Sequence, residues 1–270
     1  MIVVSGTKRS GTSMWMHVLV AAGLPHIGER FPSGWGELLR EANPDGFFES
    51  ELVAGINYRT NPHPLTGAYL SPLQTREHAV KVFIPGLIRT DVAFLDRVVA
   101  TVRGWRPFVA STRRLIALER ERGTRPDTQA VLPPALEWWT QNYALVRDLA
   151  IRGYPVHVVS YDSLLRDPSR VTAEVLAWVG VGDPERAAAV VRPELRSPGP
   201  DARDSDLADG VEPEHLEVFD ALHDAIDREL PLSPTLVDQL NRTDRALRPA
   251  VLAHQASIDA TAVADILGRQ

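Results

Sequence analysis

The sequence of 270 residues contains no cysteine, and only two of its 29 basic residues are lysines, Lys8 and Lys81. The lack of cysteine excludes a disulfide framework, thiolate metal ligands and a cysteine nucleophile. Basic residues are also fewer than acidic ones: 29 against 35, which gives a net charge of −6. Nucleic-acid-binding proteins are normally basic. We therefore expect no nucleic-acid partner.

Long hydrophobic runs are also missing. No apolar segment approaches the roughly 20 residues that a transmembrane helix needs. The first residues, MIVVSGTKRSGTSMW, lack the charged region that opens a signal peptide. A hydrophobic content of 44% and a charged content of 24% are typical of globular proteins. We expect a cytoplasmic protein without a membrane partner, and the excess of arginine over lysine is typical of a GC-rich bacterial genome.

Short apolar runs alternate with helical patterns along the chain. Residues 2–5 form an apolar run that stops at Gly6, and a glycine-containing turn and a helix follow it. The same patterns predict strands over 79–83, 106–112 and 156–160, and helices over 91–102, 113–122, 132–151 and 171–179. Such alternation is typical of a parallel sheet with right-handed crossovers. The sequence thus predicts a three-layer α/β/α fold of the P-loop NTPase-like type.

The composition changes near residue 195. Residues 197–210 are rich in Pro, Gly and Asp, which predicts a loop. Amphipathic patterns beyond it predict helices over 213–230, 234–255 and 257–268. We therefore expect a core over 1–195 and a helical C-terminal extension over 196–270, packed on that core.

The turn after the first strand favours an anion. Gly6 and Gly11 have the glycine spacing of a phosphate-binding loop, but Thr12 and Ser13 follow where a Walker A motif has Lys and Ser/Thr. Glycines let the backbone approach a ligand closely, and the start of the next helix adds its positive end. The missing Walker lysine disfavours ordinary ATP or GTP hydrolysis.

Several segments match one family in order and spacing. Lys8-Arg9-Ser10-Gly11-Thr12-Ser13 resembles the 5′-phosphosulfate loop of sulfotransferases that use 3′-phosphoadenosine-5′-phosphosulfate (PAPS), particularly the bacterial form. The later matching segments are Asn43–Glu49, Val80–Val82, Phe108–Arg113, Leu136–Tyr143 and Val158–Pro168. The resemblance covers roughly residues 1–195. It implies a sulfotransferase-type fold and transfer of a sulfuryl group from PAPS to a hydroxyl or amine of a small molecule, with PAP as product and no metal required.

The resemblance also implies roles for individual residues. Arg9, Glu49 and Lys81 are the expected catalytic residues, with Glu49 as the base. The residues expected to bind the cofactor are Lys8, Arg9, Ser10, Gly11, Thr12, Ser13, Arg113 and position 121. Arg113 corresponds to the arginine that binds the 3′-phosphate. Cations at these places would stabilise the charge on the leaving group.

The chain departs from the family at one of these positions. The family has a serine eight positions after its 3′-phosphate arginine, whereas Glu121 stands there in this alignment. A carboxylate cannot donate a hydrogen bond to a phosphate and would repel it. Either a hydroxyl of Ser111, Thr112 or Thr124 replaces the serine, or Arg114 takes over the contact, or the affinity for the cofactor is weak. Near the end of the core, Arg192 and Arg196 are the basic candidates.

Other assignments stay open from the sequence. His17, His26, His63 and His78 are alternative bases, and Phe31 and Trp35 are candidate platforms for the acceptor. A P-loop kinase with a degenerate Walker A loop is the alternative enzyme, and a non-catalytic PAP-binding protein is the alternative without chemistry. The chain could also form a homodimer.

Overall fold

The computed structural model describes residues 1–126, 129–195 and 203–267. The chain folds into two compact units, Met1–Arg103 with Ala144–Ser197 and Gly104–Tyr143 with Pro198–Gln270. The first unit ends close to the predicted end of the core, whereas 104–143 belongs with the C-terminal helices. No helix in the described part of the chain is both long and apolar enough to span a membrane.

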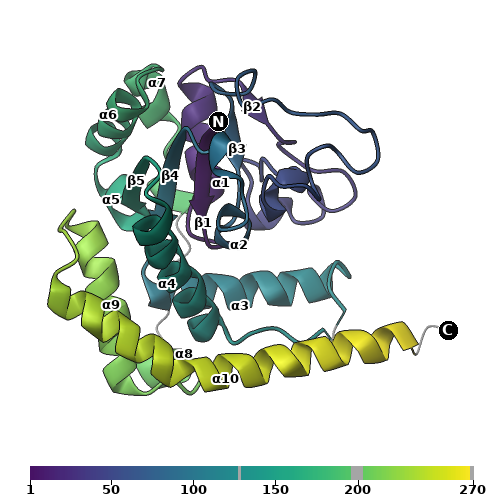
Figure 1. Cartoon of the computed structure of the whole chain (residues 1–270), viewed down its shortest axis with the longest axis vertical. Coiled ribbons are helices and arrows are strands. Elements are labelled where there is room, and N and C mark those ends of the chain that lie inside the picture. Colours follow the sequence, from purple (N-terminus) through teal and green to yellow (C-terminus); the bar gives the residue numbers. More distant parts are fainter. Residues whose placement is uncertain (127–128, 196–202, 268–270) are drawn as a thin grey trace. The chain divides into compact units, whose positions relative to one another are not determined.

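A five-stranded parallel sheet forms the centre of the first unit (Figure 1). Its order is β2-β3-β1-β4-β5, made of His26–Ile27, Ala79–Lys81, Ile2–Gly6, Arg97–Val102 and Val156–Ser160. All five residues of β1 are buried, as expected for a parallel strand covered on both faces. Helices flank the sheet, and the fold class predicted from the sequence is confirmed.

The helices of the first unit bury their apolar sides against this sheet or against one another. They are α1 (Thr12–Ala21), α2 (Ile84–Leu87), α5 (Tyr161–Arg166), α6 (Pro168–Val179) and α7 (Pro184–Ala189), with 3₁₀ turns η1 (Arg40–Ala42), η2 (Glu51–Ala54), η3 (Val92–Phe94) and η4 (Pro193–Leu195). Trp15 and Leu19 of α1 belong to one core cluster with Val4 of β1 and Val175 of α6. This cluster fixes α1, and with it the turn that precedes the helix.

Two predicted elements between residues 91 and 122 are wrong. The helix expected over 91–102 contains strand β4, because Arg97–Val102 is a buried, largely β-branched run. The strand expected over 106–112 lies inside helix α3 (Trp105–Glu121). Its buried residues Trp105, Phe108, Val109 and Thr112 have the i, i+3, i+4, i+7 spacing of a helix. Pro107 is tolerated because it lies in the first turn, where backbone N–H groups lack helical partners.

The second unit is helical. Besides α3 it contains α8 (Asp204–Leu207), α9 (Pro213–Asp227) and α10 (Pro234–Leu267), and α4 (Pro134–Arg152) begins in it. Phe219 of α9 is stacked on Trp138 and Trp139 and meets Trp105 edge to face. Residues 197–202 of the expected loop lie outside the described residues.

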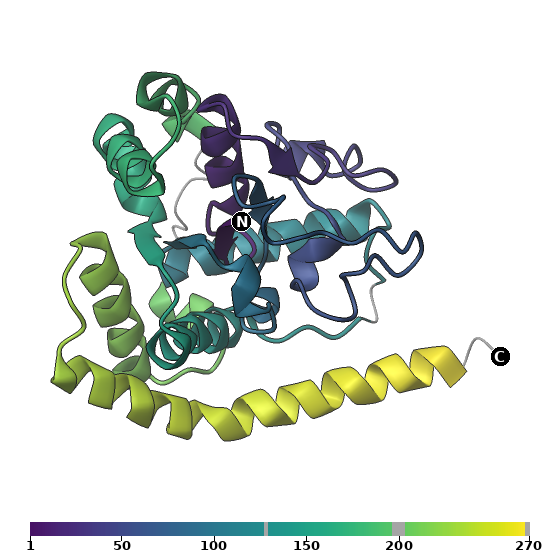
Figure 2. The same ribbon diagram turned by 45° about the horizontal axis from the view of Figure 1, so that its top comes forward.

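The C-terminal part contains one helix where two were expected. Helix α10 is continuous from 234 to 267 (Figures 1 and 2), so the predicted break near 256 is wrong. No glycine or proline stands between 250 and 267 to stop it. Its buried residues Leu236, Leu240, Thr243, Leu247 and Val251 lie on one stripe of the helix.

Candidate functional site

The turn between β1 and α1 is held by its own hydrogen bonds and by β4. The backbone N–H and the hydroxyl of Ser10 both donate to the carbonyl of Thr7, at 3.3 and 2.7 Å. The hydroxyl of Thr101 in β4 donates to the carbonyl of Ser10 at 3.0 Å. A Cβ on Gly6 would lie 2.6 Å from the carbonyl oxygen of Thr101. Glycine at position 6 thus permits the close approach of the loop to the sheet.

Gly11 sets the start of helix α1. It is the N-cap, in the left-handed region at φ 97°, where glycine is favoured. A Cβ here would lie 2.4 Å from Cδ2 of Tyr161. No side chain caps the helix, and its first turn has no acidic residue. The first N–H groups and the positive end of α1 are therefore suited to an anion.

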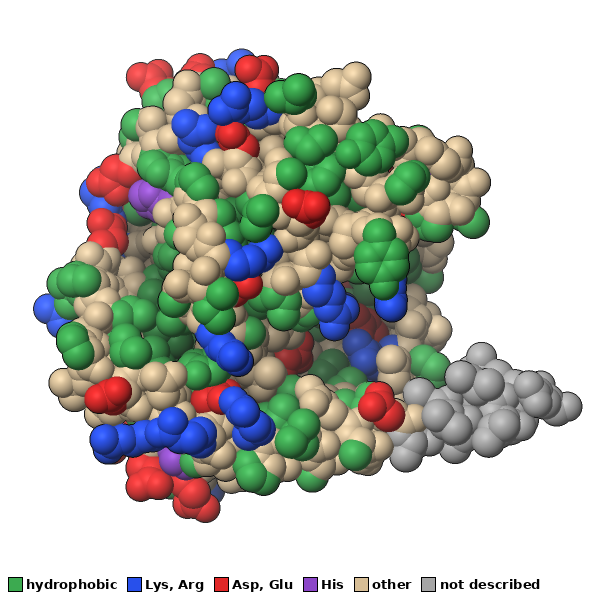
Figure 3. Space-filling model, viewed as in Figure 1, with side chains coloured by type: hydrophobic (Ala, Val, Ile, Leu, Met, Phe, Trp, Pro, Cys, Tyr) green, Lys and Arg blue, Asp and Glu red, His purple; other side chains and the backbone are tan. Residues whose placement is uncertain are grey.

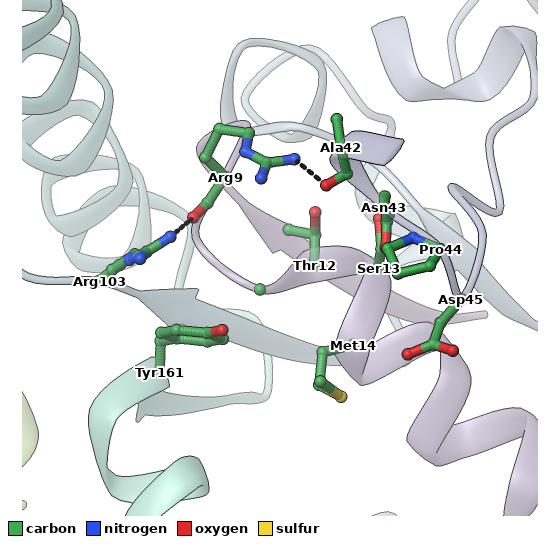
Figure 4. Close-up of a pocket in the computed structure, with 11 residues that line it drawn as sticks. Arg9, Thr12, Ser13, Met14, Ala42, Asn43, Pro44, Asp45, Arg103 and Tyr161 are labelled. Carbon is green, nitrogen blue, oxygen red and sulfur yellow. Dashed lines mark hydrogen bonds between the residues drawn. The ribbon is translucent and has the colours of Figure 1, made fainter. Parts of the chain in front are cut away.

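Two arginines lie at this helix end, in a cavity of about 100 Å³ (Figure 4). Nη1 of Arg9 donates to the carbonyl of Ala42 at 3.1 Å. Nη1 of Arg103 donates to the carbonyl of Arg9 at 3.0 Å, and its guanidinium lies 4.9 Å from the centre of the Tyr161 ring. The other lining residues are Gly11, Thr12, Ser13, Met14, Asn43, Pro44 and Asp45. We call this space the loop cavity.

Asp45 is the acidic residue among those that line the loop cavity. Arg192, one of the two basic candidates from the sequence, forms a two-point ion pair with the Asp45 carboxylate. This pairing neutralises the carboxylate beside the turn between β1 and α1. Arg196, the other candidate, lies outside the described residues.

Lys81 lies at the end of β3 and is only 2% exposed. Its Nζ donates to Oε1 of Glu49 at 2.7 Å, to Oγ of Ser13 at 3.2 Å and to the carbonyl of Phe47 at 2.5 Å. Burial lowers the pKa of Lys81 to about 8, although the neighbouring Glu49 carboxylate opposes this shift. Two expected catalytic residues are thus in direct contact with each other, and one of them, Lys81, also contacts Ser13 in the first turn of α1.

A second, larger cavity includes Glu49 in its lining. We call it the carboxylate cavity; its volume is about 870 Å³. Glu49 lines it, whereas Ser13 lines the loop cavity. Lys81 bonds to both side chains, so its ammonium links one lining residue of each cavity. The remaining lining residues are Ile27, Gly28, Glu29, Pro32, Ser33, Trp35, Ser50, Glu51, Leu52, Val53, Thr60, His63, Ala68 and Leu70.

The alternative bases and platforms have different surroundings. His63 lines the carboxylate cavity, and its Nε2 lies 3.1 Å from Oε2 of Glu51. His17 and His26 pack against the ring of Phe48. Trp35 lines the carboxylate cavity and meets Phe47 edge to face at 4.8 Å. His63 and Trp35 are therefore the two of these candidates that face this cavity.

The remaining predicted residues lie elsewhere. Lys8 is exposed, with Nζ 5.9 Å from the centre of the Phe83 ring. Arg113 lies within α3 of the second unit, where it bonds to the carbonyl of Asp206 and the carboxylate of Asp209. Glu121 is the last residue of α3 and is exposed. The prediction for Arg113 assumed that a strand precedes it, and that strand is wrong.

Arg103 is the residue that sequence reasoning missed. It directly follows β4, at the carboxyl end of a strand next to β1. The chain passes from β3 on one side of β1 to β4 on the other, and ligands of parallel sheets bind where the strand order reverses in this way. Ser111 stands eight positions after Arg103. The eight-residue spacing was available in the sequence, and the wrong placement of the strand hid it.

The chain was compared with known proteins. No family model and no curated protein matches the sequence. Among solved structures, it is similar to the sulfotransferase domain of the olefin synthase from Synechococcus PCC 7002. The two are 15% identical with a TM-score of 0.40, and the match covers 92% of this chain and 94% of that domain.

Proposed function

We propose that this protein is a cytoplasmic sulfotransferase that moves a sulfuryl group from PAPS to a hydroxyl or amine of a small molecule. The observation that carries this proposal is the position of Lys81, which bonds both to Ser13 of the anion-binding turn and to Glu49 of the carboxylate cavity. A group-transfer enzyme needs a donor site and an acceptor site that share charged groups. The resemblance of the turn and of the Glu49 segment to PAPS-dependent enzymes supports the same assignment.

The residues at the turn fit the charged part of PAPS. The uncapped start of α1 and the left-handed Gly11 favour an anion, and no acidic residue stands in the first helical turn. Arg9 and Arg103 line the same cavity and are suited to phosphate oxygens, because a guanidinium presents several donors in one plane. When bound, PAPS supplies an activated sulfuryl group, whose bond to the 5′-phosphate breaks as the bond to the acceptor oxygen forms.

Each of these side chains then has its own role in the transfer. Glu49 accepts the proton that the acceptor hydroxyl loses. Lys81 and Arg9 provide positive charge for the oxygens on which negative charge develops. The N–H groups at the start of α1 hold the 5′-phosphate. None of these roles calls for a metal ion.

We further propose that Arg103, in place of Arg113, binds the 3′-phosphate. Arg103 stands at the end of a strand beside the turn, and Ser111 follows at the spacing that the resemblance predicts. Under this alignment, position 121 has no part in cofactor binding. The Glu121 carboxylate then does not repel the 3′-phosphate, because it is not part of the cofactor site.

Ligand-induced stabilisation tests the donor. A tenfold excess of PAP over its dissociation constant should raise the free energy of unfolding by about 1.4 kcal/mol through linkage, without Mg²⁺. ADP and ATP should stabilise the protein less. Stabilisation by Mg·ATP but not by PAP would favour the kinase with a degenerate loop and reject the sulfotransferase.

Glu49→Gln tests whether Glu49, which contacts Lys81, acts as the general base. The amide oxygen can still accept a hydrogen bond from Lys81 but cannot take a proton. We expect kcat to fall by about 10²–10⁴-fold with a hydroxyl acceptor, as for loss of a general base, and PAP affinity to stay unchanged. Near-full activity would remove Glu49 as the base and leave His63 as the next candidate. Absence of transfer in the wild-type protein, despite PAP binding, would support the non-catalytic alternative.

A further inference from the structure

We propose that the carboxylate cavity selects acceptors that carry a positive charge, such as an organic ammonium group on an apolar body. The inference rests on the proposed sulfotransferase function, which leaves the acceptor undefined. Its basis is the charge of the described residues that line the cavity. They include Glu29, Glu49 and Glu51 together with the imidazole of His63, and none of them is Lys or Arg.

Backbone pairing brings two of these carboxylates onto one part of the wall. Glu29 and Glu49 form an antiparallel bridge, with N–H to carbonyl distances of 2.8 and 3.1 Å in the two directions. Side chains of directly opposite residues lie close together on the same face, and like charges at such positions repel. Glu51 is two residues further along the same segment. A local excess of negative charge is thus built into this wall.

The contacts inside the protein offset part of this charge. Lys81 neutralises Glu49 through the 2.7 Å ion pair. Glu51 has His63 at 3.1 Å, and its side chain is 53% exposed. Glu29 accepts a hydrogen bond from the backbone N–H of Ser33 at 3.2 Å. Glu29 and Glu51 therefore supply the charge that a cationic acceptor would meet, while the charge of Glu49 is balanced by Lys81.

The remaining walls favour an apolar body. Pro32, Leu52, Val53 and Leu70 line the cavity with Trp35, and the volume of about 870 Å³ lies within the range of small-molecule sites. The loop between η2 and β3 carries the exposed side chains Tyr58, Leu65, Tyr69 and Leu73. Figure 3 shows hydrophobic side chains gathered over the loops beside β2 and β3, at the upper right. An amphipathic cation would match these two kinds of surface together.

Phenols matched in size and differing in charge test the selection. The probes are 4-hydroxyphenethyl-trimethylammonium, its neutral isostere 4-(3,3-dimethylbutyl)phenol and 3-(4-hydroxyphenyl)propanoate, which share the nucleophilic phenol and have no reactive nitrogen. We expect kcat/KM to be at least tenfold higher for the cation than for the neutral phenol, and lowest for the anion. Equal or reversed values would overturn the proposal.

Variants locate the charges that make the selection. Glu29→Gln and Glu51→Gln should each lower the ratio of cationic to neutral kcat/KM by about three- to tenfold. Glu37→Gln is the matched control, because Glu37 is an exposed carboxylate paired with Arg40 and is not among the lining residues. A change of the ratio in the control but not in the two variants would contradict the assignment.

Binding measured by calorimetry separates this inference from the proposed function. The cationic phenol should bind the protein more tightly than the neutral one with or without PAP, and Glu29→Gln and Glu51→Gln should weaken it. If PAP fails to bind and no acceptor is sulfated, the proposed function fails, but this preference can still be observed. If PAPS-dependent transfer occurs without any preference for the cation, the proposed function stands and the inference fails.

Discussion

Among single residues, Arg103 is the one whose proposed role depends most on the position of strand β4. It stands at the carboxyl end of β4 and contacts the carbonyl of Arg9. Arg103→Ala should weaken PAP binding by about 1.5–3 kcal/mol, as for loss of a charged hydrogen bond, because the 3′-phosphate loses its partner. Binding of adenosine 5′-phosphosulfate, which has no 3′-phosphate, should change little. Calorimetry with the two nucleotides measures both effects.

Arg113→Ala is the matched control for this prediction. Arg113 is bonded to Asp206 and Asp209 within the second unit, so its removal should leave the affinities for both nucleotides unchanged. A selective loss of PAP binding in Arg113→Ala would restore the original assignment. Equal losses on both nucleotides in Arg103→Ala would point to a general collapse of the turn.

The activity is expected to depend on pH through the charge of Lys81. Burial lowers its pKa to about 8, so its positive charge is lost as the pH rises through that value. If the ammonium stabilises developing negative charge, kcat/KM should fall above about pH 8. Lys81→Arg keeps a positive charge at all these pH values, and its activity should fall only at higher pH. A pH–rate profile of the two proteins checks this.

A profile with the same alkaline limb in both proteins would assign that limb to another group. The side chain of Lys81 is almost fully buried, and arginine is larger. Thermal denaturation should therefore accompany the kinetics, since a variant that has lost its fold says nothing about the ammonium. Among the predicted catalytic residues, Lys81 is the one that the sequence placed within a strand, over 79–83, and the structure finds it at the end of β3.

At the scale of elements, the start of α1 depends on Gly11. Gly11→Ala should destabilise the protein for two reasons, the left-handed backbone at φ 97° and a Cβ at 2.4 Å from the Tyr161 ring. Such backbone strain alone costs about 1–3 kcal/mol. Gly23→Ala is the control, because Gly23 has φ 99° but open space around it. Chemical denaturation should show a larger loss for Gly11→Ala.

The difference between the two alanine variants isolates the steric contact with Tyr161. Equal destabilisation would show that the ring moves aside without cost. A larger loss in Gly11→Ala together with weaker PAP binding would show that the turn itself has shifted. The contact therefore links the geometry of the turn to helix α5, which Tyr161 begins.

The sequence was informative where local pattern and packing agree. The strand at 2–5, the turn after it and the strands at 79–83 and 156–160 follow from apolar runs bounded by breakers, and the structure confirms them. The region 91–122 was misassigned because VVATV and PFVAST are both rich in β-formers, and only packing separates the strand from the helix. The carboxylate cavity has no local signal, since its walls come from residues between 27 and 70 that meet only in the fold.

For the whole molecule, the aromatic cluster should control the stability of the second unit. Phe219 is fully buried and contacts Trp105, Trp138 and Trp139. Phe219→Ala should cost about 3–5 kcal/mol, the usual loss for a large aromatic in a core. Denaturation followed by tryptophan fluorescence measures it, because three of the six tryptophans surround this ring.

Leu252→Ala is the control for the cluster, because Leu252 is 57% exposed on α10. An exposed substitution of this kind usually changes stability by less than about 0.5 kcal/mol. Similar losses for the two variants would show that the cluster does not dominate this unit. Curves with two separate transitions would show that the two units unfold independently.

The central place of β1 has a consequence for folding during synthesis. Residues 2–6 are synthesised before both of their partner strands, β3 at 79–81 and β4 at 97–102. The sheet is complete only after β5 ends at residue 160. Pairing between such distant segments is slow, so β1 stays an unpaired apolar segment of the nascent chain at least until β4 has been synthesised. Chaperone contacts with this segment are therefore expected to precede folding of the turn between β1 and α1.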